Sequence, residues 1–327
     1  MRRAATPIAL VVLVALGCLV PFLGLSSYAM SVAVVALAYV VLAQGLNLIY
    51  GYAGWLSFGQ VGFWGIGAYT AAILWSREGL NPWAGVAIGG VAAAIAAFVI
   101  GLPSLRRSRT AFIIVTLTFS LLVQLLATDW IGMTRGPLGI PGLPALTIGG
   151  KRFSGAHEFY WVMLVWTVAA LALVYRLVRS RLGRTLLAIR SDEYLAQAQG
   201  IPVLRYKVAA FVLAAWLSGI AGGLYGFYLS VVDPTIFGFY FTQAMLVIVV
   251  VGGRGSFWGV TLAAIVLSVV PEMLRWANEW RLIVYGVVLV VVVLTMPGGF
   301  AGLVKDRKAA RLRMLSTGTP ALGGDEA

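Results

Sequence analysis

The feature that most constrains this chain is a series of continuously apolar blocks, each about twenty residues long, separated by polar or charged segments. A helix rises about 1.5 Å per residue, so a block of this length crosses the roughly 30 Å hydrocarbon core of a bilayer. The hydrophobic set makes up 61% of the residues and charged residues only 11%, which is too apolar for a soluble globular domain. Strands of a membrane barrel alternate apolar and polar residues, and these blocks do not. The sequence therefore predicts an all-α polytopic membrane protein.

The blocks divide into about ten transmembrane spans. The first is interpreted as an uncleaved span rather than a signal peptide, because another apolar block follows it at once. We place the spans near 8–25, 28–49, 57–76, 83–102, 110–128, 159–177, 207–230, 240–253, 257–274 and 281–297.

The basic residues predict the orientation of these spans. With a cytoplasmic N-terminus and one crossing per span, most of the 24 Lys and Arg residues fall in cytoplasmic segments, as the positive-inside rule requires. The prediction is N-in and C-in, although a re-entrant 240–253 would place every later segment on the opposite side. This pattern also explains the net charge of +13 without nucleic acid, since no DNA-binding motif accompanies it.

The chain is expected to form one transmembrane domain over 1–302, followed by a cytoplasmic basic segment and disordered tail over 303–327. Two connections are long. The external loop 129–158 is rich in turn residues, whereas the cytoplasmic loop 178–206 contains a stretch, 182–199, that favours helix.

A glycine-rich run from Gly45 to Tyr69 is the first candidate functional segment. Glycines in apolar surroundings permit close helix approach or a broken helix, and broken helices commonly build polar sites at membrane depth. Amide and hydroxyl groups here are able to hydrogen-bond an amino acid, but the same residues also serve as packing contacts between helices. The candidate pathway residues are Asn47, Gly51, Gly54, Ser57, Gln60 and Gly65.

A charged cytoplasmic stretch is the second candidate. It is bounded by Gly183 and by Gly200, which is followed by Ile-Pro, so a helix there has a defined end. Such a helix either docks against another protein or is a solvated connection. Its candidate coupling residues are Arg190, Glu193, Ala196, Gly200, Ile201 and Pro202.

The sequence lacks the residues that several classes of function require. The acids Asp129, Asp233, Glu272 and Glu279 fall at span ends, which leaves an ion-coupled carrier little to work with. We find no phosphate-binding loop, zinc helix or nucleophile elbow, so neither enzymatic chemistry nor a metal or cofactor bound by this chain is expected. If ATP powers transport, another chain binds it.

Together the two candidate segments, with the run from Val249 to Gly259, resemble the permease subunits of branched-chain amino-acid ABC importers. The similarity is closer to the LivM type than to its LivH-type partner, and it covers roughly 30–300. The stretch around Glu193 and Gly200 resembles the coupling-helix motif of ABC permeases, while Gln60 stands where many relatives carry histidine.

The resemblance implies an ABC importer permease fold in a bacterial inner membrane. It implies as partners a second, LivH-type permease, two cytoplasmic ATPase subunits of the LivG and LivF type that bind ATP and Mg, and an extracytoplasmic solute-binding protein. The expected cargo is leucine, isoleucine and valine. The alternatives are a related importer of urea or short-chain amides, an ion-coupled secondary transporter, and a membrane-embedded enzyme.

Overall fold

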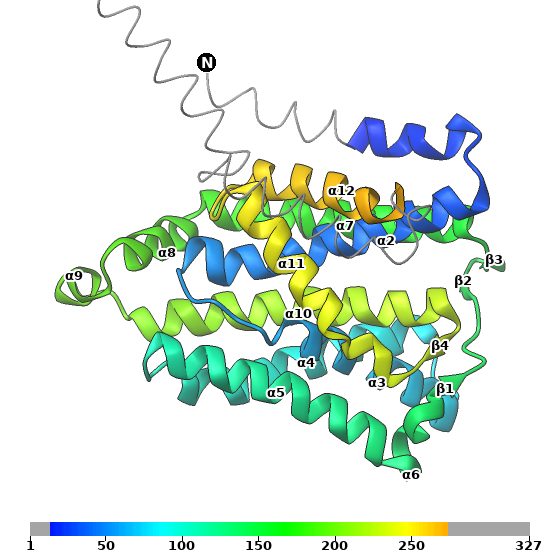
Figure 1. The fold of residues 1–327 in the computed structure, drawn as a ribbon, viewed down its shortest axis with the longest axis horizontal. Helices are drawn as coiled ribbons and strands as arrows, with labels where there is room; N and C mark the ends of the chain where they lie inside the picture. Colours follow the sequence, from blue (N-terminus) through cyan, green and yellow to red (C-terminus); the bar gives the residue numbers. More distant parts are fainter. Residues whose placement is uncertain (1–13, 274–327) are drawn as a thin grey trace, which may run out of the picture.

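The computed structural model describes residues 14–273 of the 327-residue chain. Long helices lie side by side along its longest axis, with two short helices projecting at one end and small strands gathered at the other (Figure 1). We refer to these as the α8–α9 end and the strand end. Residues 14–19 are helical and lead into the first element. The elements are η1 (Val20–Leu23), α2 (Ser27–Leu46), η2 (Asn47–Tyr52), α3 (Gln60–Glu78), α4 (Pro82–Ser104), α5 (Arg109–Asp129), α6 (Ile131–Thr134), η3 (Gly136–Leu138), β1 (Ile140–Pro141), β2 (Leu146–Ile148), β3 (Lys151–Phe153), α7 (Ala156–Arg179), α8 (Arg181–Ser191), α9 (Glu193–Ala198), α10 (Val203–Leu229), β4 (Val231–Val232), η4 (Pro234–Phe237), α11 (Phe239–Gly252) and α12 (Phe257–Met273).

Six helical stretches among the described residues are long and apolar enough to cross a membrane. They coincide with the spans predicted at 28–49, 83–102, 110–128, 159–177, 207–230 and 240–253. The spans predicted at 57–76 and 257–274 fall on α3 and α12, which are helical but are not among these six. The span at 8–25 lies partly, and that at 281–297 wholly, outside the described residues.

Local signals explain where several helices begin and end. The side chains of Ser26, Asn81 and Ser108 each accept a backbone N–H in the first turn of α2, α4 and α5. Pro82 occupies the first position of α4, where its missing N–H costs nothing. Gly79 ends α3 with φ +60°, a conformation that glycine adopts without strain.

The centre of the bundle is formed by α3, α4 and α10, whose backbones approach closely at glycines. A Cβ added at Gly67 on α3 would lie 1.9 Å from the Gly219 carbonyl oxygen on α10. A Cβ at Gly89 on α4 would lie 2.5 Å from the Gly67 carbonyl oxygen. This confirms that the glycine-rich run allows close helix approach at Gly67, and Gly89 and Gly219 allow the same approach from α4 and α10.

Two small antiparallel sheets depart from the all-α prediction. β1 pairs with β4, with Ile140 opposite Val232, and β2 pairs with β3, with Thr147 opposite Arg152. Both involve the turn-rich connection 129–158, which also holds α6 and η3. Strands of two or three residues satisfy backbone groups here, β2 and β3 within the connection and β1 with the residues that follow α10.

Candidate functional site

The candidate site begins where the α-helix α2 ends. α2 passes at Asn47 into the π-helical turn η2, and 53–59 then continues without helix until α3 begins at Gln60. In Figure 1 this connection runs back from the α8–α9 end toward the middle of the bundle. The broken helix that the glycine-rich run permits is therefore present, and we call 47–59 the interrupted segment.

The non-helical backbone of this segment is hydrogen-bonded by side chains of α5. The Phe58 N–H donates to Thr116 Oγ1 (3.2 Å), and Ser120 Oγ donates to the Phe58 carbonyl oxygen (3.0 Å). Within the segment, the Trp55 N–H donates to the carbonyl oxygen of Ile49 (3.1 Å). Backbone groups at membrane depth need such partners because lipid offers none. The position of the segment thus depends on two hydroxyl groups of α5.

Asn47 joins the interrupted segment to the loop between α11 and α12. Its Oδ1 accepts the Gly255 N–H (2.9 Å), and its Nδ2 donates to the Ser256 carbonyl oxygen and to Gln44 Oε1 (3.4 Å each). Gln44 Nε2 donates in turn to the Phe257 carbonyl oxygen (2.8 Å). Asn47 and Gln44 are both buried. Two neighbouring amides therefore bind the end of α2 to the start of α12. We call this connection the α2–α12 joint.

Gly51 and Gly54 allow other groups to approach the same place. A Cβ at Gly51 would lie 1.9 Å from Asn47 Oδ1 and 2.5 Å from the Gly255 nitrogen. Gly54 has φ +80°, and a Cβ there would lie 3.1 Å from Cγ of Arg190. A side chain at either position would disturb the joint, so both glycines are explained by close contact.

Arg190, at the end of α8, reaches this joint. Its Nη1 donates to the Gly51 carbonyl oxygen and to the Arg254 carbonyl oxygen, the latter at 3.3 Å. Arg254 itself donates from Nη1 to the Tyr50 hydroxyl (3.0 Å). A residue predicted to couple to the ATPase thus contacts residues predicted to line the pathway, which sequence spacing did not indicate.

The remaining predicted pathway residues lie elsewhere. Ser57 is buried, and its hydroxyl accepts a backbone N–H two residues further on (3.1 Å). Gln60 Oε1 accepts from Ser218 Oγ (2.8 Å), while its buried Nε2 has no partner among the described residues. Gly65 faces the ring of Phe237, whose Cε1 would lie 1.9 Å from an added Cβ. The six predicted residues therefore do not converge on one site.

The predicted coupling stretch forms two helices instead of the one continuous helix expected over 182–199. α8 ends and α9 begins at Asp192, which is extended (φ −153°, ψ 113°). The Asp192 carboxylate accepts the Leu195 N–H (3.0 Å), so it caps the second helix. An aspartate competes for backbone donors in this way, and the resulting break changes the direction of the chain.

The end of α9 follows the sequence prediction closely. Gly200 has φ +79°, and the Ile201 N–H donates to the Ala196 carbonyl oxygen (3.1 Å), the pattern that ends many helices. Ala196 is buried beside Ile189 of α8 in a small apolar cluster. Pro202 follows as the N-cap of α10. Four residues are thereby enough to turn the chain from α9 into the next long helix.

Glu193 and Lys207 form an ion pair between α9 and α10. Lys207 is 1% exposed, and its Nζ also lies 3.8 Å from the centroid of the Trp55 ring. An ammonium group over an aromatic face is attracted by the negative potential of the ring. The sequence analysis missed both Lys207 and Trp55, although a lysine at the start of a long apolar stretch was a visible signal.

α8 and α9 also carry large apolar side chains that nothing in the described chain covers. Tyr194 is 85% and Leu195 58% exposed. Figure 1 shows that α9 projects beyond the end of the long helices. An exposed apolar patch of this kind on a projecting element is typical of a surface that binds another protein.

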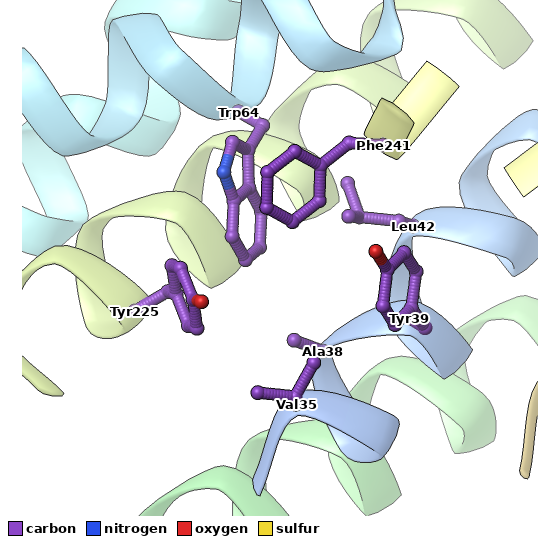
Figure 2. Close-up of a pocket in the computed structure, with 7 residues that line it drawn as sticks. All are labelled: Val35, Ala38, Tyr39, Leu42, Trp64, Tyr225 and Phe241. Atoms are coloured by element: carbon purple, nitrogen blue, oxygen red, sulfur yellow. The ribbon is translucent and has the colours of Figure 1, made fainter. Parts of the chain in front are cut away.

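A narrow hollow between α2, α3, α10 and α11 was not predicted (Figure 2). Figure 2 shows the ring of Trp64 beside that of Phe241, opposite side chains of α2. The indole Nε1 of Trp64 is buried and has no partner among the described residues. The lining residues are Val35, Ala38, Tyr39, Leu42, Trp64, Tyr225 and Phe241.

The described residues contain no group of three or more His, Cys, Asp or Glu side chains that could hold a metal ion. The candidate site therefore consists of a broken helix, a hydrogen-bonded joint and a projecting helical pair. With six apolar helices of spanning length among the described residues, these features define a multi-pass membrane protein.

Comparison with known proteins identifies the family. Residues 28–293 match the model of the family described as branched-chain amino acid transport system, permease component, and the chain belongs to that family. It is 34% identical to the high-affinity branched-chain amino acid permease LivM of Escherichia coli K12, over 91% of this chain and 75% of that protein. It is 26% identical to LivH of Salmonella typhimurium, over 81% and 91% of the two chains. A probable LivM of Methanocaldococcus jannaschii is 23% identical over 80% and 89%.

No solved structure matches the chain.

Proposed function

We propose that this chain is the LivM-type permease subunit of a bacterial inner-membrane ABC importer that carries leucine, isoleucine and valine. The observation that carries the proposal is the 34% identity to a LivM permease over 91% of the chain. Because the similarity extends over nearly the whole chain, it includes both the spans and the loops between them. The chain performs no chemistry on its cargo in this scheme.

We place the α8–α9 end in the cytoplasm and the strand end outside. The α8–α9 end holds Arg106, Arg107, Arg109, Arg176, Arg179, Arg181, Arg184, Arg190, Arg205, Lys207 and Arg254, whereas the strand end holds Arg77, Arg135, Lys151 and Arg152. This excess of positive charge at one end supports the orientation. It is compatible with ten spans and with N-in and C-in termini.

The ATPase subunits dock on α8 and α9 in this proposal. Tyr194 and Leu195 project from this end, and Glu193, Ala196, Gly200, Ile201 and Pro202 shape the turn that presents them. ATP and Mg bind to two separate ATPase subunits, and their closure moves the helical pair. Exposed tyrosine and leucine side chains on a projecting turn suit a pocket in such a partner.

Two further partners complete the importer. The loop 129–158, which contains β1, β2 and β3, receives the loaded solute-binding protein at the strand end. A second, LivH-type permease pairs with this chain in the membrane, as the similarity to both LivM and LivH proteins suggests. Lipid covers the remaining apolar faces.

The cargo path runs along the interrupted segment between the two permeases. Asn47, Gly51, Gly54, Ser57, Gln60 and Gly65 remain the proposed path residues. The Nε2 of Gln60, which has no partner within residues 14–273, supports a polar contact there. Asn47, Ser57 and Gln60 are buried in the described chain, so the proposal requires that the segment move to admit the cargo. Movement of this kind is the basis of alternating access.

Uptake of radiolabelled leucine tests the proposal. Cells with and without the gene are compared at sub-micromolar leucine, with unlabelled valine, urea and short-chain amides as competitors. We expect uptake to fall in the deletion strain and only aliphatic amino acids to compete. Unchanged leucine uptake, or competition by urea or amides, would contradict the branched-chain assignment.

A further inference from the structure

Two cationic side chains connect the α8–α9 pair to two places in the interrupted segment. Arg190 of α8 contacts Gly51 in η2, and Lys207 of α10 contacts both Glu193 of α9 and Trp55 in the non-helical part. Arg190 and Glu193 flank the extended residue Asp192. α8 thus contacts the interrupted segment directly through Arg190, whereas α9 reaches it through Lys207 of α10.

We propose that Arg190 and Lys207 form a two-point linkage that transmits displacement of α8 and α9 to the interrupted segment. This inference rests on the proposed function, in which the ATPase subunits move the helical pair. Arg190 and Lys207 are positioning residues: they contact neither cargo nor nucleotide in the scheme, and they act by moving 47–59.

The Lys207 contact restricts both of its neighbours. Its side chain is 2% exposed, whereas that of Glu193 is 24% exposed, so the ammonium group has little water to replace a lost partner. Moving the carboxylate away would leave a buried charge without its ion partner. Moving the ring away would remove the cation–π contact. Glu193 and Trp55 are therefore held together by a charge that disfavours their separation.

The Arg190 contact works through shape as well as hydrogen bonds. Its guanidinium donates to backbone carbonyl oxygens on both sides of the joint, at Gly51 and Arg254, and its Cγ lies over Gly54. A planar group with several fixed donors suits such bridging better than a lysine would. Displacing the end of α8 would thus pull on η2 and on the α11–α12 loop together.

Beyond Trp55, ring contacts continue into the bundle. Trp55 packs edge-on against Phe112 of α5 (centroids 5.6 Å apart), and Phe112 packs against Phe211 of α10 (5.2 Å). Phe211 contacts Phe63 of α3 (5.3 Å). Because close-packed side chains cannot absorb a displacement, movement of Trp55 must be shared with these helices.

The first test measures coupling in the complete importer, reconstituted with both permeases, two ATPase subunits and the solute-binding protein. We compare Lys207→Met/Glu193→Gln, which removes both charges, with Arg190→Met, Lys207→Arg and the exposed control Arg205→Met. We expect leucine transported per ATP hydrolysed to fall at least ten-fold in the first two. Arg205→Met should stay within about two-fold of the unmodified importer. Lys207→Arg should lose less coupling than the double variant, since a guanidinium keeps the ion pair and the ring contact but adds volume at a buried site.

The second test does not depend on leucine. The native Cys18 is first removed by Cys18→Ser, and Ser57→Cys then places a thiol in the interrupted segment. The rate at which maleimide labels this thiol reports the position of the segment. We expect the rate to differ several-fold between nucleotide-free and ATP-vanadate states, and this difference to vanish in Arg190→Met and in the double variant while vanadate trapping persists.

These readouts separate the linkage from simple structural support and from the proposed cargo. If the unmodified importer does not transport leucine, the cargo assignment is wrong but the linkage is still tested. The labelling experiment requires only the ATPase subunits and no cargo. The linkage would be overturned if Lys207→Met/Glu193→Gln transported as much leucine per ATP as the unmodified importer. It would also be overturned if the labelling rate of the unmodified importer were the same with and without nucleotide. Should the double variant fail to assemble, Arg190→Met decides, because it removes contacts of a partly exposed side chain.

Discussion

The α3–α4–α10 centre and the α2–α12 joint, with its contacts to α8 and α9, are both closely packed, but different forces hold them. In the centre, glycines let backbones touch, and the contacting atoms have no freedom to move aside. At the joint, amides, guanidinium groups and an ion pair bridge helices through directional contacts. Both regions exclude an added side chain at their glycines, but only the hydrogen bonds and the ion pair of the second region can break and re-form. The α3–α4–α10 centre is therefore the more rigid of the two regions.

Disrupting the α3–α4–α10 centre should have the largest effect. In Gly67→Leu the new side chain meets the Gly219 backbone oxygen, 1.9 Å from an added Cβ, and cannot be accommodated by a rotamer change. We expect destabilisation above about 3 kcal/mol, the upper end of the usual overpacking range. Size-exclusion chromatography in detergent should show almost no monodisperse protein. The control Gly155→Leu has open space around its Cβ and should behave as wild type.

The ion pair should respond unequally to loss of its two members. Glu193→Ala leaves the buried Lys207 ammonium without its carboxylate and should cost roughly 3 kcal/mol. Lys207→Met leaves a carboxylate that water reaches and should cost about 1–2 kcal/mol, mostly through the lost ring contact. The thermal midpoint of each purified variant measures the difference. Equal shifts would mean that burial does not control this pair.

The hydroxyls of α5 offer a finer test of the interrupted segment. Thr116→Val keeps the shape of the side chain but leaves the Phe58 N–H unpaired, which should cost about 1–2 kcal/mol. Thr118→Val on the exposed face of the same helix is the matched control. Thermal unfolding should separate the two variants, and identical midpoints would show that the hydroxyl does not support Phe58.

The smallest effect on stability is expected at the projecting helix. Tyr194→Ala changes an 85% exposed side chain and should alter the free energy of unfolding by less than about 0.5 kcal/mol. Co-purification of the ATPase subunits should nevertheless decrease several-fold if this face docks them. If the ATPase subunits co-purify with Tyr194→Ala as well as with the unmodified chain, Tyr194 is not part of the docking surface.

Much of the fold follows from hydropathy and local signals. The spans at 28–49 and 110–128 were recognisable because apolar length is a local property, and Gly200 marked the end of α9 because few residues adopt a positive φ. The candidate site was only partly predictable. The broken helix was indicated by its glycines, but the break at Asp192 was not, because a single cap competes with the helix propensity of a whole stretch.

Hydropathy, glycine content and charge were enough to predict a helical membrane protein, the positions of most described helices, and the two candidate segments at 45–69 and 183–202. The contact between those segments comes from the packing of the helices. Arg190 and Gly51 are 139 residues apart, and no local pattern records their hydrogen bond. Propensity, capping and hydropathy depend on near neighbours in the chain, whereas the partners of Arg190, Lys207 and Asn47 depend on how separate helices pack.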